Sequence, residues 1–251
     1  MEKKLYVGGL SFDTTEEELK AAFDGGIREV LLGHSGLSAQ GSLNPEEMNA
    51  LAAAAVNYGI KPVILWDTLM CDPDLDAAGC VLLSLELSLF SAIRVLDPGA
   101  LGFVLENTNL PIQLILRSGN HNIESILGWI SFDRRVVRVV LSSELPKTRL
   151  DDYLKRIPVE VEILGVVPIL LFYTPRHLLT FQGASASSGS MLSALASCEE
   201  DSHSGFRVIE TRHGTLMFHS KDYNLLDKVA ELQQIGVAAL EIGIAHSGGS
   251  P

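Results

Sequence analysis

The sequence has few cysteines, few basic residues and no long hydrophobic run. Only three cysteines occur in 251 residues, Cys71, Cys80 and Cys198, and their spacing is not that of a disulfide framework. This excludes a disulfide-stapled secreted domain and is typical of a reducing cytoplasm. The 19 Lys and Arg residues are outnumbered by 31 Asp and Glu, which gives a formal net charge of -12. Such an acidic surface repels phosphate backbones, so we expect no broad nucleic-acid-binding face.

The most apolar stretch, residues 77–93, is interrupted by Glu86 and three serines. A membrane-spanning helix needs about 20 predominantly apolar residues, so a buried helix fits this stretch better. The N-terminal residues have neither the apolar core nor the cleavage site of a signal peptide. We therefore expect no membrane association and a cytoplasmic location.

Short apolar runs alternate along the chain with longer helical ones. Residues 61–67, "KPVILWD", form a continuous apolar run of the kind found in strands buried on both faces. Residues 43–59 read as a helix that Asn44 caps, with Pro45 in its first turn. About eight such strands, nearly all separated by helices, predict an α/β fold, a (β/α)8 TIM-type barrel. A doubly wound sheet would give the same alternation.

The barrel is predicted to occupy residues 1–251 as a single domain, incomplete at its C-terminal end because no helix follows the last strand. Residues 182–205, rich in Ser, Gly and Ala, are expected to be an irregular insertion. Residues 74–90 are expected to be one helix, and the strand from residue 159 to run into an apolar loop. Residues 206–220 should form a hairpin that turns at His213-Gly214.

The opening residues 3–23, "KKLYVGGLSFDTTEEELKAAF", suggest a different module. They read like the first strand and helix of an RNA-recognition motif. That motif needs a second, basic and aromatic strand about thirty residues later, on which bases stack. Residues 34–56 contain no Phe, Tyr, Trp, Lys or Arg. The segment is therefore interpreted as the first β–α unit of the barrel.

Several segments, taken in order, resemble the collagenase-like peptidase family U32. They are "EELKAAFDGGIREVLLG", "LNPEEMNALAAAAVNYGIKPVILWDTL", "VLDPGALGFVLENTNLPIQLILRSGNHN", "VVRVVLSSELPKTRLDDYL", "VEVEILGVVPILLFYTPRHLLT" and "SKDYNLLDKVAELQQIGVAALEI". The resemblance covers nearly the whole chain. It implies a TIM barrel with a peptidase activity, or a component of oxygen-independent hydroxylation of RNA bases or of a quinone precursor.

The family signature, approximately E-x-F-x-H-G-x-x-C-x-x-x-S-G-x-C, is only partly kept. Glu162 stands at or near its glutamate and Arg176 at the arginine that often precedes the last cysteine, but Leu170 and His177 replace the two cysteines. Farther on, only Cys198 fits the family's cysteine pattern. Relatives use four cysteines for an iron–sulfur cluster, so we expect no such cluster here. The alternative to an enzyme is a non-catalytic homologue that forms a hetero-oligomer with a related, cluster-bearing family member.

The resemblance gives Glu162, Arg176 and Cys198 as candidate catalytic residues. Two acidic neighbours would raise the pKa of the Cys198 thiol, which disfavours it as a nucleophile. His177, Cys198 and His203 offer imidazole and thiolate ligands that would suit zinc with one open position. The alternative is that they are loop residues that bind no metal, since a Ser-rich loop commonly carries solvated histidines.

Strand ends supply a second set of candidates, because the carboxyl ends of barrel strands form the functional face. The candidate substrate-binding residues are Asp67, Asn122, Glu144 and Lys221. Lys221 could bind an anionic substrate together with Arg117 and Arg176. A salt bridge or a helix cap explains the carboxylates equally well, and Ser220 or Asp222 is a candidate helix cap. Cys80 is expected to fill core space.

Overall fold

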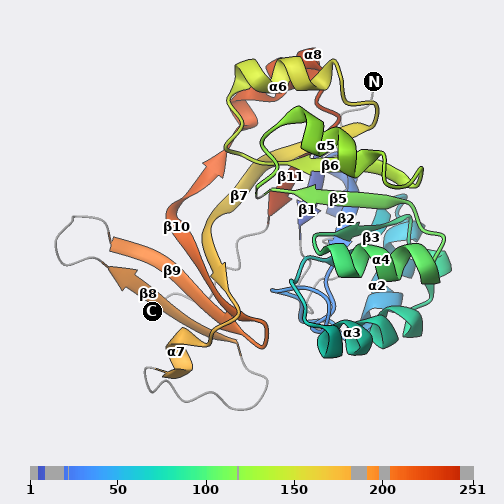
Figure 1. Ribbon diagram of the computed structural model, residues 1–251, viewed down its shortest axis with the longest axis vertical. Coiled ribbons are helices and arrows are strands. Elements are labelled where there is room, and N and C mark those ends of the chain that lie inside the picture. Colours follow the sequence, from blue (N-terminus) through green and yellow to red (C-terminus); the bar gives the residue numbers. More distant parts are fainter. Residues whose placement is uncertain are drawn as a thin grey trace.

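The computed structural model describes residues 5–8, 20–21, 23–117, 119–181, 191–197 and 204–243. Its strands form one sheet whose parallel part closes on itself, because the last strand, β11, pairs with both β1 and β7. The closed part consists of β1 (Leu5–Gly8), β2 (Ile27–Leu32), β3 (Lys61–Trp66), β4 (Ala92–Val95), β5 (Ile112–Leu116), β6 (Val136–Leu141), β7 (Glu160–Thr174) and β11 (Ala239–Gly243). The predicted TIM-type barrel is confirmed, and β11 completes the ring of strands (Figure 1).

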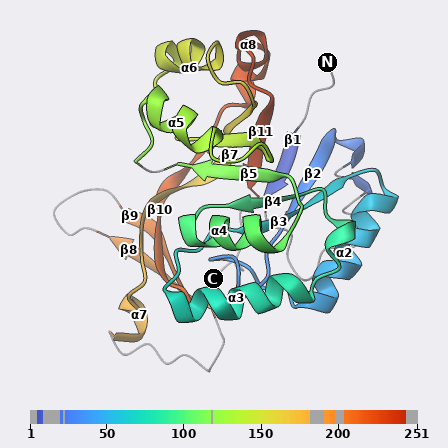
Figure 2. The same cartoon turned by 45° about the vertical axis from the view of Figure 1, so that its right-hand side comes forward.

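Helices follow the strands and lie on the outside of the ring (Figures 1 and 2). They are α2 (Pro45–Asn57), α3 (Asp72–Ser84), η1 (Leu87–Leu89), α4 (Pro98–Asn107), α5 (Ile123–Ile130), α6 (Lys147–Leu154), η2 (Leu226–Lys228) and α8 (Val229–Ile235). Among the described residues, no helix is long and apolar enough to cross a membrane.

Local sequence explains where several helices begin. The Asn44 side chain accepts a hydrogen bond from the Glu47 amide, the Glu47 carboxylate accepts one from the Asn44 amide, and Pro45 occupies the first turn. This is the start that the sequence predicts for α2. Asp97 caps α4 and Asn122 caps α5 in the same way, each accepting from the amide three residues later.

The main hydrophobic core lies between the strands and the helices. Trp66 on β3 is fully buried there and meets Phe103 of α4 edge-on, with 6.1 Å between ring centroids. Leu31 on β2, Val63 on β3 and Ala92 on β4 form a small apolar cluster that is separate from the main core. Their neighbours along each strand face the main core. Because successive side chains of a strand point to opposite faces, these three residues lie on the inner face of the barrel.

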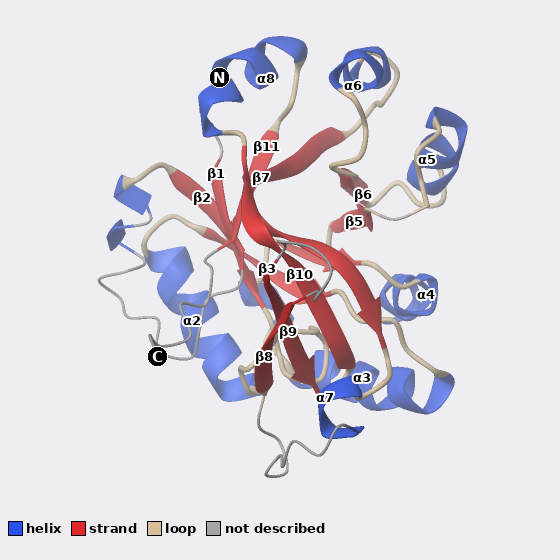
Figure 3. Cartoon of the chain, turned by 90° about the vertical axis from the view of Figure 1, so that its left-hand side faces the viewer, coloured by secondary structure: helices blue, strands red, loops and turns tan. Residues whose placement is uncertain are grey.

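The second half of β7 leaves the barrel and becomes part of an antiparallel sheet. From Val166 onward it pairs with β10 (Gly214–Asn224), which pairs with β9 (Ser204–Thr211), which pairs with β8 (Leu192–Ser197). We call residues 166–181, 191–197 and 204–224 the extension; it also carries the short helix α7 (Leu178–Phe181). The extension projects from one side of the barrel (Figures 1 and 3).

Several local predictions are corrected. The helix expected over residues 74–90 ends at Ser84 and is followed by η1. The apolar stretch expected as a loop is strand β7 up to Thr174, because β10 supplies its hydrogen-bonding partner. Strand β8 lies within the segment expected to be irregular. Ser220 and Asp222 belong to β10 and cap no helix. The hairpin at His213-Gly214 is confirmed.

Candidate active site at the mouth of the barrel

A network of charged and polar side chains fills part of the barrel interior. We call it the barrel network, and its members are Glu29, Arg94, Gln113, Arg138, Glu160, Glu162 and Glu241. Arg94 on β4 is fully buried at its centre. Its guanidinium donates to Gln113 Oε1 at 2.8 and 2.9 Å, to Glu162 Oε2 at 2.7 Å and to Glu241 Oε2 at 3.0 Å.

Arg138 on β6 is the second cation of the barrel network. It donates to both carboxylate oxygens of Glu29, at 2.7 and 3.0 Å, and to Glu162 Oε2 at 3.2 Å. It also pairs with Glu160. Burial alone would raise the pKa of Glu29, but the hydrogen bonds and charge of Arg138 hold that pKa below its usual value. Glu29 therefore stays ionised inside the protein.

Glu162 and Glu241 form a buried carboxyl pair, in which each group affects the pKa of the other. Burial, together with the charge of Glu241, raises the pKa of Glu162 although Arg94 opposes the shift. Burial also acts on Glu241, but the charges of Arg117 and Arg94 prevail and lower its pKa. Glu162 is therefore the member of the pair that holds a proton more readily. Its Oε1 is buried and has no hydrogen-bond partner among the described residues.

Three side chains lie where the barrel network reaches the carboxyl ends of the strands, and we call them the mouth site: Asp67, Arg117 and Glu241. Asp67 follows β3, Arg117 follows β5, and Glu241 lies on β11. Arg117 pairs closely with Glu241. The charges of Glu162 and Asp67 also raise the pKa of Arg117. Residues from three separate strands therefore meet at the end of the barrel where TIM-barrel enzymes carry their active sites.

Asp67 is held by the loop that follows β2. Its Oδ1 accepts the Ala39 amide at 2.9 Å, and the nearby Ser38 side chain favours the charged form of the same carboxyl group. Burial raises the pKa of Asp67 in spite of these interactions and of the charge of Arg117. A carboxyl group with a raised pKa can take up and release a proton nearer to neutral pH than an ordinary aspartate can.

The Arg117 side chain is partly exposed at the mouth. Its exposed fraction is 34%, whereas that of Glu241 is 10%. Its Nε is buried and has no hydrogen-bond partner among the described residues. An arginine of this kind can bind a carboxylate or a carbonyl oxygen of a ligand.

The extension packs against the same loop that holds Asp67. His213 Nε2 lies 2.7 Å from the Ser35 carbonyl oxygen, and the Tyr173 hydroxyl donates to the His213 carbonyl oxygen at 2.6 Å. Ala39 packs with Ile209, Leu216 and Phe218 of the extension in a small apolar cluster. Burial lowers the pKa of His213, which favours its neutral form. The extension therefore forms one side of the mouth.

The structure places two of the candidates from the sequence inside the barrel or at its mouth and the other described candidates elsewhere. Glu162 lies in the barrel network and Asp67 at the mouth. Arg176 and Lys221 are exposed on the extension. Asn122 caps α5, and the exposed Glu144 pairs with His121 at 3.0 Å.

The metal candidates lie in or beside the extension. His177 is exposed, with its Nε2 3.1 Å from the Thr211 carbonyl oxygen. Cys198 and His203 lie outside the described residues. Within the described ranges, no group of three or more His, Cys, Asp or Glu side chains could hold a metal ion.

Leu170, at the first signature cysteine position, is an exposed apolar side chain. Leu170 and His177 do not fit a four-thiolate cluster. Cys80 is exposed, so its expected core role is wrong.

Sequence reasoning missed most of the barrel network. The missed residues are Glu29, Arg94, Gln113, Arg138, Glu160 and Glu241. A signal was present for four of them, because Arg94, Gln113, Arg138 and Glu241 are each a single polar residue inside a short apolar run, as in "AIRVL" and "VVRVVL". A strand buried on both faces has no solvent for such a residue, so a polar partner must face it across the barrel.

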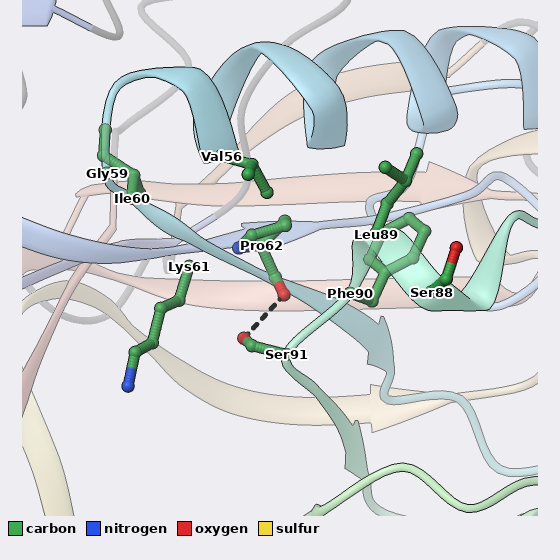
Figure 4. Close-up of a pocket in the computed structure, with 9 residues that line it drawn as sticks. All are labelled: Val56, Gly59, Ile60, Lys61, Pro62, Ser88, Leu89, Phe90 and Ser91. Carbon is green, nitrogen blue, oxygen red and sulfur yellow. Dashed lines mark hydrogen bonds between the residues drawn. The ribbon is translucent and has the colours of Figure 1, made fainter.

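A shallow hollow of about 350 Å³ lies at the opposite end of the barrel, where strands begin (Figure 4). The end of α2, the start of β3 and the residues before β4 line it, and the Ser91 hydroxyl donates to the Pro62 carbonyl oxygen at 2.8 Å. Lys61 is its one charged lining residue. This amino-terminal end of a barrel usually serves stability. The hollow therefore carries no candidate site.

The fold is similar to that of several solved proteins. A structure described as the U32 peptidase Mk0906 covers 100% of this chain and 95% of its own, at 12% identity and a TM-score of 0.54. A monomeric dihydrodipicolinate synthase variant matches at 13% identity and a TM-score of 0.46, over 63% of this chain. The matched part spans 62% of that synthase chain. The spore cortex-lytic enzyme SleL of Bacillus megaterium matches at 10% identity, covering 96% of this chain and 70% of its own, with a TM-score of 0.46.

No curated protein matches the sequence. The model of peptidase family U32, in contrast, matches residues 14–245. That match runs from before β2 to just beyond β11, so it includes most of the barrel and the whole extension. The resemblance seen in the sequence is thereby confirmed, and the chain belongs to peptidase family U32.

Proposed function

We propose that the chain is a hydrolase of peptide bonds that acts at the mouth of the barrel, with Asp67 as general base and acid. The observation that carries the proposal is the meeting of a carboxyl group of raised pKa, Asp67, with a partly exposed arginine, Arg117, at the carboxyl ends of the strands. The family name agrees with this activity. Cysteines without paired spacing fit the cytoplasm as the place of action.

In this mechanism the nucleophile is water. The Asp67 carboxylate removes a proton from the water as its oxygen bonds to the peptide carbonyl carbon, and Arg117 stabilises the negative charge that develops on the carbonyl oxygen. Asp67 then returns the proton to the leaving nitrogen as the carbon–nitrogen bond breaks. The products are a carboxylic acid and an amine, so atoms and protons balance.

The barrel network supports this chemistry without taking part in it. Glu162 is fully buried and receives hydrogen bonds from Arg94 and Arg138, so it is a positioning residue. Its role is to hold Arg94 and thereby Glu241, the partner that fixes Arg117 at the mouth. Arg176 and Cys198, the other candidates from the signature region, have no part in this mechanism.

The test is casein or gelatin hydrolysis by purified protein. Asp67→Asn keeps an oxygen that can accept the Ala39 amide but cannot accept a proton from water, so we expect a loss of about 100-fold or more in rate. The matched control is Asp97→Asn, because Asp97 also follows a parallel strand but only caps α4. Equal activity in the wild type and Asp67→Asn would refute the proposed role of Asp67.

Cys198→Ala separates a water mechanism from a thiol mechanism. If water is the nucleophile, this variant retains full activity. A complete loss in Cys198→Ala, with activity retained in Asp67→Asn, would transfer the nucleophile to the thiol and overturn the mechanism.

Hydroxylation through an iron–sulfur cluster has less support in this chain. The positions of the two signature cysteines are occupied by Leu170 and His177, which supply no thiolate. Protein purified without oxygen should therefore be colourless and free of iron. A brown, iron-containing preparation would favour hydroxylation instead.

One observation favours a second candidate, a non-catalytic partner of a related, cluster-bearing U32 protein. Leu170, Leu171 and Phe172 are adjacent on β7, and each is between 40% and 47% exposed. Successive side chains of a strand alternate between its two faces, so these three leave exposed apolar area on both faces of β7, which another protein could cover. Co-purification with a cysteine-complete relative, abolished by Leu171→Asp but not by Leu226→Asp on η2, would support this candidate. The absence of any complex would remove it.

A further inference from the structure

Strand β8 forms an open edge of the sheet. The strand order ends β7-β10-β9-β8, and β8 pairs on one side only, with β9 (Figure 3). No backbone hydrogen bond joins the other side of β8 to a described residue. Backbone N–H and C=O groups on that side bond to no described residue and have the geometry to pair with a further strand.

The sequence of β8 does not protect this edge. Leu192–Ser197 reads LSALAS, with no charge and no proline, which are the usual means of preventing strand addition. The Leu195 side chain is 76% exposed, and Met191 just before the strand is 50% exposed. An uncharged edge with an exposed leucine at its centre is suited to a neighbouring strand of the same character.

The strand is also symmetric in sequence. Ser193, Ala194, Leu195, Ala196 and Ser197 read the same in both directions. Two copies that pair antiparallel, with Leu195 on the twofold axis, place Leu195 opposite Leu195, each alanine opposite an alanine and each serine opposite a serine. Directly opposed residues share a face of the sheet, so the two exposed leucines would cover each other.

We propose that β8 pairs with β8 of a second copy of this chain in this register, and so joins the two extensions into one antiparallel sheet. A twofold interface uses the same surface on both copies, which the symmetric strand provides. This interface goes beyond the proposed hydrolase activity and does not depend on it.

The size of the strand sets the strength of the dimer. Five residues of each β8, 193–197, lie opposite one another in this register, which is less than a standard interface of about 1,600 Å² needs. We expect a dimer that is populated at about 100 μM chain and dissociates on dilution to about 1 μM, as weak interfaces do. Each copy carries a net charge of -12, so added salt should strengthen the dimer by screening the repulsion.

Cysteine cross-linking tests the register in a background in which Cys71, Cys80 and Cys198 are replaced by Ser. Leu195→Cys should form a disulfide dimer by itself under mild oxidation. Ser193→Cys and Ser197→Cys should each cross-link poorly alone and well when mixed, because they face each other across the axis. The control is Leu226→Cys, an equally accessible site on η2 with 50% exposure. Cross-linking of Leu195→Cys no better than that of Leu226→Cys would overturn the proposal.

Sedimentation measures the same interface without a cross-link. Leu195→Lys puts two positive charges on the axis and should weaken dimerisation by at least about tenfold, whereas Leu226→Lys should leave it unchanged. Leu195 is exposed, so its replacement leaves the fold intact. A wild-type chain that stays monomeric at about 100 μM, or a dimer that Leu195→Lys does not weaken, would refute the proposal. Asp67→Asn should dimerise like the wild type, which separates the interface from the activity.

Discussion

The barrel and the extension distribute polar and apolar side chains in opposite ways. Inside the barrel, Arg94 and Glu162 are fully buried charged residues. In the extension, Leu171 and Leu195 are apolar and 46% and 76% exposed. A single strand, β7, connects the two regions and belongs to both.

The difference shows which interactions hold each region together. The barrel obtains its hydrophobic stabilisation from the layer between strands and helices, so its interior can hold a polar network that positions Arg117 and Glu241. The extension has only a small apolar cluster, in which Ile209, Leu216 and Phe218 pack against Ala39. Four other apolar side chains of the extension, Leu170, Leu171, Phe172 and Leu195, are exposed and can contact other chains.

Breaking the barrel network should have the largest effect. Arg94→Met removes the cation that joins Glu162, Glu241 and Gln113 and leaves buried carboxyl groups without their partner. Removal of one partner of a buried ion pair costs about 3–5 kcal/mol of the free energy of unfolding. Urea denaturation of the purified variant measures the loss.

The matched control is Arg156→Met, since Arg156 also pairs with a glutamate, Glu124, but on the surface. Such exposed pairs contribute about 0–1 kcal/mol. If Arg94→Met and Arg156→Met lowered the free energy of unfolding equally, the barrel network would not be a stabilising element of the fold.

Two leucines on β7 allow the stability of the barrel and of the extension to be compared within one strand. Leu164, in the barrel part, is 8% exposed, and Leu171, in the extension, is 46% exposed. Leu164→Ala should lower the free energy of unfolding by about 2–4 kcal/mol, because it leaves a cavity. Leu171→Ala should change it by less than about 0.5 kcal/mol. A large loss in Leu171→Ala under the same thermal denaturation would mean that the extension is stabilised as tightly as the barrel.

The alternation of apolar runs predicted the barrel because each β–α unit carries its own signals. Asn44 and Pro45 set the start of α2 through local contacts, so the sequence alone identifies them. The second half of β7 and strand β8 could not be found in this way. Serine and alanine have low strand propensity, and β8 is a strand only because β9 pairs with it. β10, which holds the end of β7, is about forty residues away along the chain.

The mouth site could also be predicted in part from local signals. Asp67 and Arg117 follow parallel strands, and the carboxyl ends of parallel strands in a barrel all lie at one end of it. Glu162 was predicted from its position in the family signature and not from its neighbours in the sequence. Glu241 is brought to Arg117 by the closure of the ring, a contact between residues 124 positions apart. No local pattern could indicate that pairing.

A substitution at the turn of the extension should disturb that region alone. Gly214 has φ of +121°, and a Cβ there would lie 2.1 Å from the Thr174 carbonyl oxygen. Gly214→Ala should therefore loosen the β9–β10 hairpin at a local cost of about 1–3 kcal/mol. Hydrogen exchange should accelerate in residues 204–224 and stay unchanged in β3 to β6. Gly205→Ala is the control, because Gly205 also has positive φ but an open surrounding. Faster exchange throughout the barrel would contradict the independence of the two regions.

The smallest effect we expect is a pH dependence at Asp67, the residue at which the two regions meet. Its folded-state pKa is raised above the ordinary 3.8, with burial as the main cause. A carboxyl group with a raised folded-state pKa adds stability that is fully present below the unfolded pKa and is lost as the pH rises through the folded pKa. The wild type should therefore be more stable relative to Asp67→Asn at pH 3.5 than at pH 8, by at most about 1 kcal/mol. Thermal denaturation of both proteins at the two pH values measures this difference. A relative stability that rises with pH would show that the Ala39 hydrogen bond and the Ser38 side chain, and not burial, dominate the carboxyl group.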